Sequence, residues 1–281
     1  MTDNKIKKSI NGLSVDVEDY FHVSNFEHMV SFDQWEEFEL RVEKNTLRVL
    51  ELFAKHKATA TFFILGWVAE RLPDLVKEIS KQGHEVASHG YRHRLVYNLT
   101  PDEFKSDLLK TNDILSGLTG KKVLGFRAPS YSITDKNLWA LDVLKECGFL
   151  YDSSIFPIHH HRYGIPDFPR YKTEVALKDG SSITEFPIST LRLGSKNFPI
   201  GGGAYARLLP WWFLKFGYNR INKVEQKPFV FYFHPWEIDA NQPRMECSAF
   251  TRLRHYGGLS RFASKLDKML SAFQFTSIKN L

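Results

Sequence analysis

Short apolar segments alternate with amphipathic segments through the first half of the chain. Apolar, β-branched stretches predict strands at residues 13–17, 59–65, 84–88, 123–127 and 149–153. Apolar residues at helical spacing predict helices between them, at residues 45–57, 72–81, 101–118 and 134–147. Because parallel strands need a crossover connection, this alternation predicts an α/β fold of parallel βα units, closed as a barrel or open as a sheet.

The second half of the chain is less regular, although both patterns return. Strands are predicted at residues 229–233 and 275–278, helices at 208–224 and 259–273, and a basic aromatic loop at 252–256. Three consecutive glycines at 201–203 lack the spacing of a phosphate-binding loop and predict a tight backbone passage. No repeat or linker stands out, so we predict one domain spanning residues 1–281.

Composition narrows the possible partners. The net charge is +6, but the cationic residues are scattered, which does not indicate a nucleic-acid-binding protein. Cys147 and Cys247 are not arranged as a Cys-x-x-Cys pair. The polar N-terminus lacks the apolar stretch of a secretory signal, and no run approaches a membrane span. We therefore expect a cytoplasmic protein without a transmembrane segment.

Two histidines four residues apart, His89 and His93, follow the predicted strand at 84–88. A helical or tightly turned backbone would point both imidazoles the same way, which suits a divalent transition metal. The same spacing also occurs in polar loops with solvated histidines, so it decides nothing alone. The histidine triplet at 159–161 indicates a loop over the substrate rather than a metal site, because adjacent residues do not face together.

Other polar residues also stand at the ends of predicted apolar strands. They are Asp16, Glu18 and Asp19, Arg127, Asp152 and His234. A carboxylate at the end of a buried strand is costly unless it is paired or binds a cation. Since the carboxyl ends of barrel strands carry the chemistry, these residues and the histidine pair predict a single site at one rim.

This set of residues suits hydrolysis of an amide. A carboxylate and two histidines are typical of hydrolytic metal sites with positions open for water and substrate. A second carboxylate would serve as general base, and a histidine on the far side as general acid. Arg127 would hold the base through a charge-assisted pair, and a backbone N–H after Pro129 would help to stabilise the oxyanion.

Five motifs also resemble a known family. They read SVDVEDYF (14–21), SHGYRH (88–93), FRAPSYS (126–132), YDSSIFP (151–157) and FHPWE (233–237). With them the chain is similar to the polysaccharide deacetylases with a NodB homology domain (carbohydrate esterase family 4). Within that family it resembles the subgroup linked to exopolysaccharide gene clusters and exosortase systems. The resemblance covers nearly the whole chain and implies a deformed (β/α)7 barrel and a Zn²⁺-type metal.

The resemblance also implies roles for individual residues. By position, Asp16 is the general base and Arg127 orients it, while His234 is the general acid and Asp152 orients His234. These four residues are therefore the expected catalytic set.

His89 and His93 are implied as metal ligands, but the third ligand is less direct. The family's commonest first motif has two adjacent Asp residues, base then ligand, whereas here the base is followed by Val, Glu and Asp. We favour Asp19, because aspartate is the usual ligand. Glu18 is the alternative, since residues i and i+2 of a strand face the same side. Zn²⁺ is expected, and Co²⁺ or Ni²⁺ would also suit two histidines and a carboxylate.

We therefore predict a metal-dependent de-N-acetylase acting on N-acetylhexosamine units of a bacterial surface polysaccharide or its lipid- or nucleotide-linked precursor. Tyr131 and Trp236 are candidates to stack on sugar faces, and simple packing is as good an explanation of each ring. Because Ser130 follows Pro129 where many members have an aromatic residue, the oxyanion donor is the N–H of Ser130 or Tyr131. Two alternatives are a metal-dependent hydrolase of a small non-sugar amide or cyclic imide, and a non-catalytic sugar-binding protein.

Overall fold

The central feature of the computed structural model, which describes residues 9–24 and 26–281, is a sheet with the strand order β10-β1-β2-β3-β4-β5-β7-β6. The seven strands from β10 to β7 run parallel, β6 is antiparallel to β7, and β11 adds a parallel strand beside β1. Their bounds are β1 (Ile10–Val17), β2 (Thr61–Ile64), β3 (Glu85–Ser88), β4 (Gly125–Phe126), β5 (Tyr151–Asp152), β6 (Thr173–Ala176), β7 (Ser182–Glu185), β10 (Val230–Phe233) and β11 (Gln274–Thr276).

The sheet curls until the chain after β7 meets β10. There the Ser189 N–H donates to the Val230 carbonyl oxygen at 3.4 Å, and Ser189 Oγ accepts from the Val230 N–H at 2.8 Å. A few irregular contacts thus replace a regular ladder at the seam. The result is the predicted deformed barrel of seven parallel strands.

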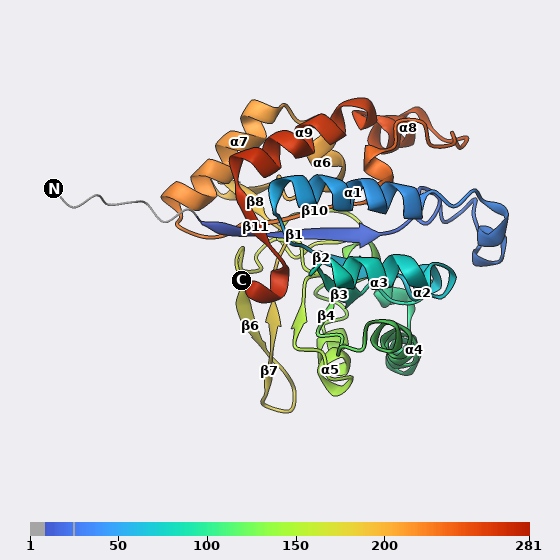
Figure 1. Ribbon diagram of the computed structural model, residues 1–281. Helices are drawn as coiled ribbons and strands as arrows, with labels where there is room; N and C mark the ends of the chain where they lie inside the picture. Colours follow the sequence, from blue (N-terminus) through green and yellow to red (C-terminus); the bar gives the residue numbers. More distant parts are fainter. Residues whose placement is uncertain (1–8, 25) are drawn as a thin grey trace.

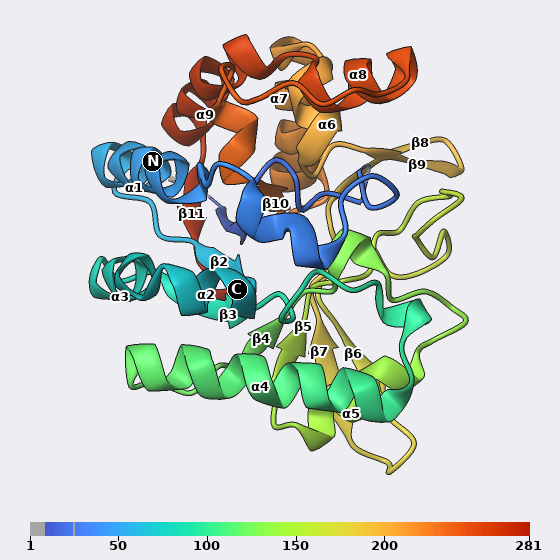
Figure 2. The same ribbon diagram turned by 90° about the vertical axis from the view of Figure 1, so that its right-hand side faces the viewer.

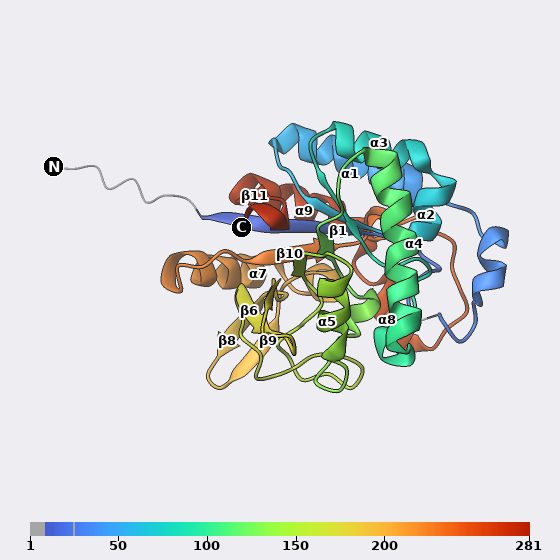
Figure 3. The same ribbon diagram turned by 90° about the horizontal axis from the view of Figure 1, so that it is seen from below.

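Helices cover the outside of the sheet, with α7 and α9 above it and α4 and α5 below it in Figures 1 and 2. Seen from below, α4 and α5 lie across the near face (Figure 3). The helices are α1 (Val42–His56), α2 (Gly66–Arg71), α3 (Pro73–Lys81), α4 (Pro101–Thr119), α5 (Trp139–Glu146), α6 (Gly203–Leu208), α7 (Trp211–Asn219), α8 (Ala249–Tyr256) and α9 (Leu259–Ala272). A separate hairpin joins β8 (Thr190–Leu193) to β9 (Lys196–Pro199).

Helix α4 shows how closely local sequence signals decide the ends of an element. Thr100 Oγ1 accepts from the Glu103 N–H at 3.2 Å, and Glu103 Oε2 accepts from the Thr100 N–H at 2.9 Å. This capping box satisfies two N–H groups that the first turn cannot pair, and Gly120 ends the helix at a φ of +65°. The helix predicted at 101–118 is therefore confirmed.

Three predicted elements in the later chain are different in the structure. The helix predicted at 208–224 is broken at Pro210, which lacks the N–H that a continuous helix needs, and the stretch after α7 is a π-helical turn, Arg220–Val224. The helix predicted at 134–147 begins only at Trp139, the first residue of α5. Thr134 does not start it, because its N–H donates to Asn137 Oδ1 in a turn. The segment 252–256, predicted as a loop, belongs to α8.

The glycine run at 201–203 is the tight backbone passage that the sequence predicts. Gly202 pairs with Tyr232 of β10, and a Cβ on Gly202 would lie 1.9 Å from the Tyr232 carbonyl oxygen. Only glycine allows that approach at a φ of +146°. Within the ranges described here, no helix is long and apolar enough to cross a membrane.

Candidate active site

One open cavity collects residues that lie at or after the ends of the barrel strands. The side chains that line its inner part come from β1, from the turn after β3, from the loop after β4 and from the end of β10. They include Asp16, Glu18, His93, Tyr131, His234 and Trp236. The structure thus brings residues far apart in the sequence to one rim of the barrel.

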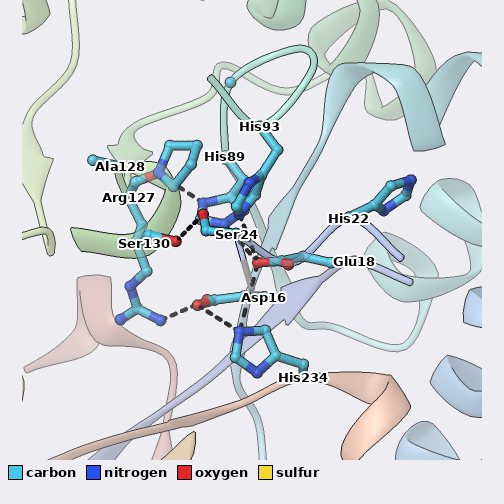
Figure 4. A network of polar contacts seen from close by, with 12 residues as sticks. Asp16, Glu18, His22, Ser24, His89, His93, Arg127, Ala128, Ser130 and His234 are labelled. Carbon is cyan, nitrogen blue, oxygen red and sulfur yellow. Dashed lines mark hydrogen bonds and ion pairs between the residues drawn. The ribbon is translucent and has the colours of Figure 1, made fainter. Parts of the chain in front are cut away.

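The Glu18 carboxylate lies against the two imidazoles of the histidine pair (Figure 4). Its Oε1 atom is 3.1 Å from His89 Nε2 and 3.4 Å from His93 Nε2, and all three side chains are buried. His89 Nδ1 lies 2.7 Å from the backbone oxygen of Arg127, which only accepts, so the ring donates there. In the neutral ring the Nε2 lone pair then faces Glu18. One carboxylate and two imidazole nitrogens therefore form a donor set that fits a divalent metal.

The turn that carries the two histidines is tight rather than helical. Gly90 has a φ of +73° and His93 a φ of 53°, so the chain reverses direction between the two rings. The turn is held by the Gly66 N–H, which donates to the Gly90 carbonyl oxygen at 2.9 Å. The Tyr91 N–H also donates to Asp107 Oδ2, at 2.8 Å. These bonds fix the positions of both imidazoles before any ligand binds.

The structure corrects the predicted third ligand, Asp19. Its carboxylate accepts the N–H groups of Tyr20 at 2.9 Å, of Arg41 at 2.6 Å and of Val42 at 2.7 Å. Arg41 and Val42 form the start of α1, whose unpaired N–H groups and positive dipole end attract a carboxylate. Asp19 is therefore a helix cap. Glu18, the alternative, lies at the histidine pair instead.

The buried guanidinium of Arg127 fixes the Asp16 carboxylate. Its Nη1 donates to Asp16 Oδ1 at 2.7 Å and to Ser14 Oγ at 2.8 Å. Its Nε and Nη2 donate to the backbone oxygen and Oγ of Ser153, at 3.0 and 2.9 Å. Because these bonds hold the guanidinium in place, they also hold Oδ1 of Asp16 in place. The other carboxylate oxygen of Asp16, Oδ2, lies 3.9 Å from His234 Nε2.

His234 is held on its other side by an ion-paired glutamate. Its Nδ1 lies 2.9 Å from Glu237 Oε2, and Glu237 Oε1 accepts from Arg207 Nε at 2.6 Å. Burial lowers the pKa of His234, but the negative charge of Glu18 and the hydrogen bond with Glu237 outweigh burial and raise it to about 9. Burial raises the pKa of Glu237, but Arg207 and His234 outweigh it and lower the value to about 2. The imidazole therefore carries a proton at neutral pH.

The sequence analysis did not find Glu237 or Arg207. Glu237 had a signal, because it stands three residues after His234 and its carboxylate also accepts the His234 N–H at 2.9 Å, as in a capping box. Arg207 comes from α6, and nothing in the sequence points from that helix to this site.

Two family models divide the chain between them. Residues 26–151 match the model described as Polysaccharide deacetylase, and residues 153–281 match a Domain of unknown function (DUF3473). Residues 26–151 therefore carry a polysaccharide deacetylase domain. The boundary between the two models falls at β5, inside one sheet, and both matched regions contribute residues to the cavity.

Curated relatives match part of the chain, and solved structures share its fold. A peptidoglycan-N-acetylglucosamine deacetylase of Bacillus cereus is 35% identical over 98 residues, which are 34% of this chain and 36% of the relative. This chain thus spans about a third of that relative's length. A putative polysaccharide deacetylase from Mycobacterium smegmatis superposes with a TM-score of 0.60 at 18% identity, covering 98% of this chain and 93% of its own. Puue allantoinase gives 0.61 at 18% identity, covering 96% and 88%. At such identities the superpositions show the shared barrel.

Within this barrel, Asp152 does not take the predicted place behind His234. Its Oδ1 accepts from Ser154 Oγ at 2.5 Å, and on the neighbouring strand its register partner is Glu185. Burial raises the pKa of Asp152 to about 6, and burial together with the charge of Asp152 raises that of Glu185 well above its usual range. The two acids form a buried carboxyl pair, and Glu237 is the residue that orients His234.

The two aromatic residues predicted to bind sugar, Trp236 and Tyr131, differ in the contacts that their side chains make. Trp236 is stacked between His234, at 5.2 Å between ring centroids, and His255, at 4.3 Å. These contacts give the ring a role in supporting His234, and because Trp236 also lines the cavity, its stacking on a sugar stays a prediction. Tyr131 lines the cavity, and its hydroxyl has no hydrogen-bond partner among the described residues. Its role in binding substrate stays a prediction.

Proposed function

We propose that this chain is a divalent-metal-dependent de-N-acetylase acting on N-acetylhexosamine units of a bacterial surface polysaccharide or its lipid- or nucleotide-linked precursor. One observation carries the proposal. A carboxylate and imidazoles that could hold a metal lie in one cavity with a second carboxylate, Asp16, and a further histidine, His234. The polysaccharide deacetylase domain at residues 26–151 and the name of the Bacillus cereus relative, a peptidoglycan-N-acetylglucosamine deacetylase, support a glycan substrate.

Glu18, His89 and His93 would hold the metal. A buried carboxylate oxygen and one nitrogen of each imidazole lie within 4.8 Å of one another, which places three potential ligand atoms around one point. When bound, the metal supplies Lewis acidity toward a carbonyl oxygen and toward water. The donor set favours Zn²⁺, and Co²⁺ or Ni²⁺ would also fit it.

Asp16 and His234 would move the protons. Asp16 Oδ2 accepts a proton from the water that adds to the amide carbon, while Arg127 keeps the other oxygen fixed. His234 Nε2 donates a proton to the amide nitrogen as the C–N bond breaks, which releases acetate and a free amine. Glu237 stabilises the positive charge on His234 before that step.

The N–H of Ser130 is the better candidate for stabilising the oxyanion. The Tyr131 N–H already donates to the Ala128 carbonyl oxygen at 3.0 Å, so it is not available. Ser130 and Tyr131 both have positive φ values, 51° and 56°, which non-glycine residues rarely adopt. Such strain is often kept where a backbone group must point into a site.

Acetate release from N-acetylhexosamine oligosaccharides, with Zn²⁺ or Co²⁺ added, tests this function. We expect Asp16→Asn and His234→Ala each to lower kcat/KM by about 10²- to 10⁴-fold, because each removes one proton-transfer group. His161→Ala, an exposed histidine outside the cavity, is the matched control and should keep full activity. An Asp16→Asn variant as active as the parent would refute the proposed chemistry.

The two alternatives are separated by parallel assays. Small amides and cyclic ureides, screened beside the glycans, test hydrolysis of a non-sugar substrate, and exclusive turnover of these compounds would favour it. Calorimetric binding of an N-acetylated sugar without any acetate release would favour a binding protein. The base, ligand set and acid, all present in one cavity, argue against that reading.

A further inference from the structure

Two arginines that the proposed reaction does not use line the same cavity. Arg162 comes from the loop after β5, and Arg254 comes from α8. Both are partly exposed, whereas Asp16 and Glu18 are buried. The two guanidinium groups therefore belong to the outer part of the cavity, which we call the cationic rim.

The acidic residues of the cavity do not need this rim for charge balance. Asp16 is paired with Arg127 at 2.7 Å, and Glu237 with Arg207 at 2.6 Å. Glu18, the remaining acidic residue along the cavity wall that the structure describes, faces imidazoles. The positive charges of the cationic rim are therefore not needed to neutralise the acidic residues of the cavity.

The rim arginines have few partners of their own. Arg162 Nη2 pairs with Glu27 Oε1 at 2.5 Å, but the Glu27 side chain is 48% exposed, and such surface pairs are weak. The Arg254 side chain makes no ion pair with any residue in the described ranges. Its backbone oxygen accepts from Arg207 Nη2 at 2.7 Å, which ties the end of α8 to α6. Arg254 is therefore anchored through its backbone while its charge stays available, and the Arg162 charge is held only by an exposed pair.

The loop before Arg162 is stiffened by stacked rings. The rings of His160 and Tyr163 are stacked 3.8 Å apart, and Tyr163 stacks on Phe156 at 6.1 Å. Gly164 allows a close turn, since a Cβ there would lie 2.4 Å from the backbone oxygen of Ile158. The histidine triplet thus contributes packing to a loop that presents Arg162 at the cavity.

We propose that Arg162 and Arg254 bind an anionic group, a carboxylate or a phosphate, that the substrate carries next to its N-acetylated sugar. This inference rests on the proposed function. Guanidinium groups match both anions with paired hydrogen bonds, and partial burial strengthens the attraction relative to open water. A neutral glycan would leave the Arg254 charge without an ionic partner among the described residues and Arg162 with only its exposed pair to Glu27.

Matched substrates test the rim. Acetate release is compared for neutral N-acetylglucosamine oligosaccharides, for oligosaccharides with alternating glucuronate, and for N-acetylglucosamine linked through a diphosphate. The two anionic substrates distinguish carboxylate from phosphate. We expect Arg254→Met to lower kcat/KM on the preferred anionic substrate about 10- to 100-fold, mainly through KM, and to change the neutral substrate by less than about 3-fold. Arg252→Met, an exposed arginine of α8 that does not line the cavity, is the control.

Each outcome decides the matter. The inference is wrong if the parent protein prefers neither anionic substrate. It is also wrong if the Arg254→Met variant loses activity equally on neutral and anionic substrates. If no glycan releases acetate, the proposed function fails, and calorimetric titration with the same sugars still tests the rim. Tighter binding of an anionic sugar that Arg254→Met abolishes supports the inference, whereas equal or absent binding overturns it.

Discussion

Glu18 and Asp19 are adjacent acids with different tasks, and single substitutions should separate them. Asp19→Ala removes the acceptor of three backbone N–H groups, two of them at the start of α1. Three bonds to a charged group would contribute about 5–9 kcal/mol. Burial outweighs these bonds and raises the pKa of Asp19 to about 6, so desolvation of the charge offsets much of this contribution. We expect a net loss of about 3 kcal/mol of unfolding free energy, or roughly 6–12 °C in Tm.

The same substitution should leave metal binding intact. Asp19→Ala, purified below its lowered Tm, should still hold about one metal ion per chain by elemental analysis. Glu18→Gln is the matched variant, because it keeps the shape of the side chain and removes its charge. It should lose the metal and lower the Tm of the metal-free protein at neutral pH, because the neighbouring histidines outweigh burial and hold the pKa of Glu18 well below its usual range.

Calorimetry in the presence of chelator measures the stability of both variants without a contribution from the metal. If Asp19→Ala were folded and metal-free, or Glu18→Gln still held stoichiometric metal, the assignment of the third ligand from the contacts would be wrong. A double variant that only adds the two separate effects would show that the two acids act independently.

Three further outcomes follow from single contacts. Glu237→Gln should lower kcat/KM roughly 10- to 100-fold at unchanged metal content, because His234 loses its charged partner; an unchanged rate would exclude the pairing as a positioning device. Gly202→Ala should cost at least about 2 kcal/mol in urea unfolding, since its Cβ would meet the Tyr232 carbonyl oxygen. Burial lowers the pKa of His84 to about 4, so the unfolded chain binds this proton more tightly, and stability should fall as pH drops from 6.5 to 4. The loss is about 1–2 kcal/mol at pH 5, and His84→Gln should show a shallower decline.

The barrel could be predicted because its signals are local. Each parallel strand is a short apolar run, and helices such as α4 carry their own caps, so sequence neighbours decide these elements. Helix α8 was missed because its exposed apolar residues, Phe250 and Leu253, do not form a stripe that faces a core. The β8–β9 hairpin was missed because its strands are four residues long and half exposed.

In the site, too, the residues next to strand ends could be predicted, and the contacts made by distant segments could not. Asp16, the histidine pair and His234 could be predicted, because each directly follows or ends an apolar strand. The rings that stack on Trp236 could not all be predicted, since His255 comes from α8, 19 residues further along the chain. Long-range packing, rather than residue type, decides how much of that ring a sugar could contact.

What separates a metal ligand from the other buried acids is which partner the fold supplies. Asp19 receives the N–H groups at the start of α1, and Asp152 receives Ser154 Oγ and a neighbouring carboxyl group. Glu237 receives the guanidinium of Arg207. Each of these acids is compensated by groups that carry hydrogen. Glu18 faces the nitrogens of three histidines, His89, His93 and His234, and in neutral His89 the facing nitrogen carries no hydrogen, so this cluster offers the lone pairs that a divalent cation would bind. The sequence placed acids of one kind at several strand ends, and only the elements packed against each one determine its task.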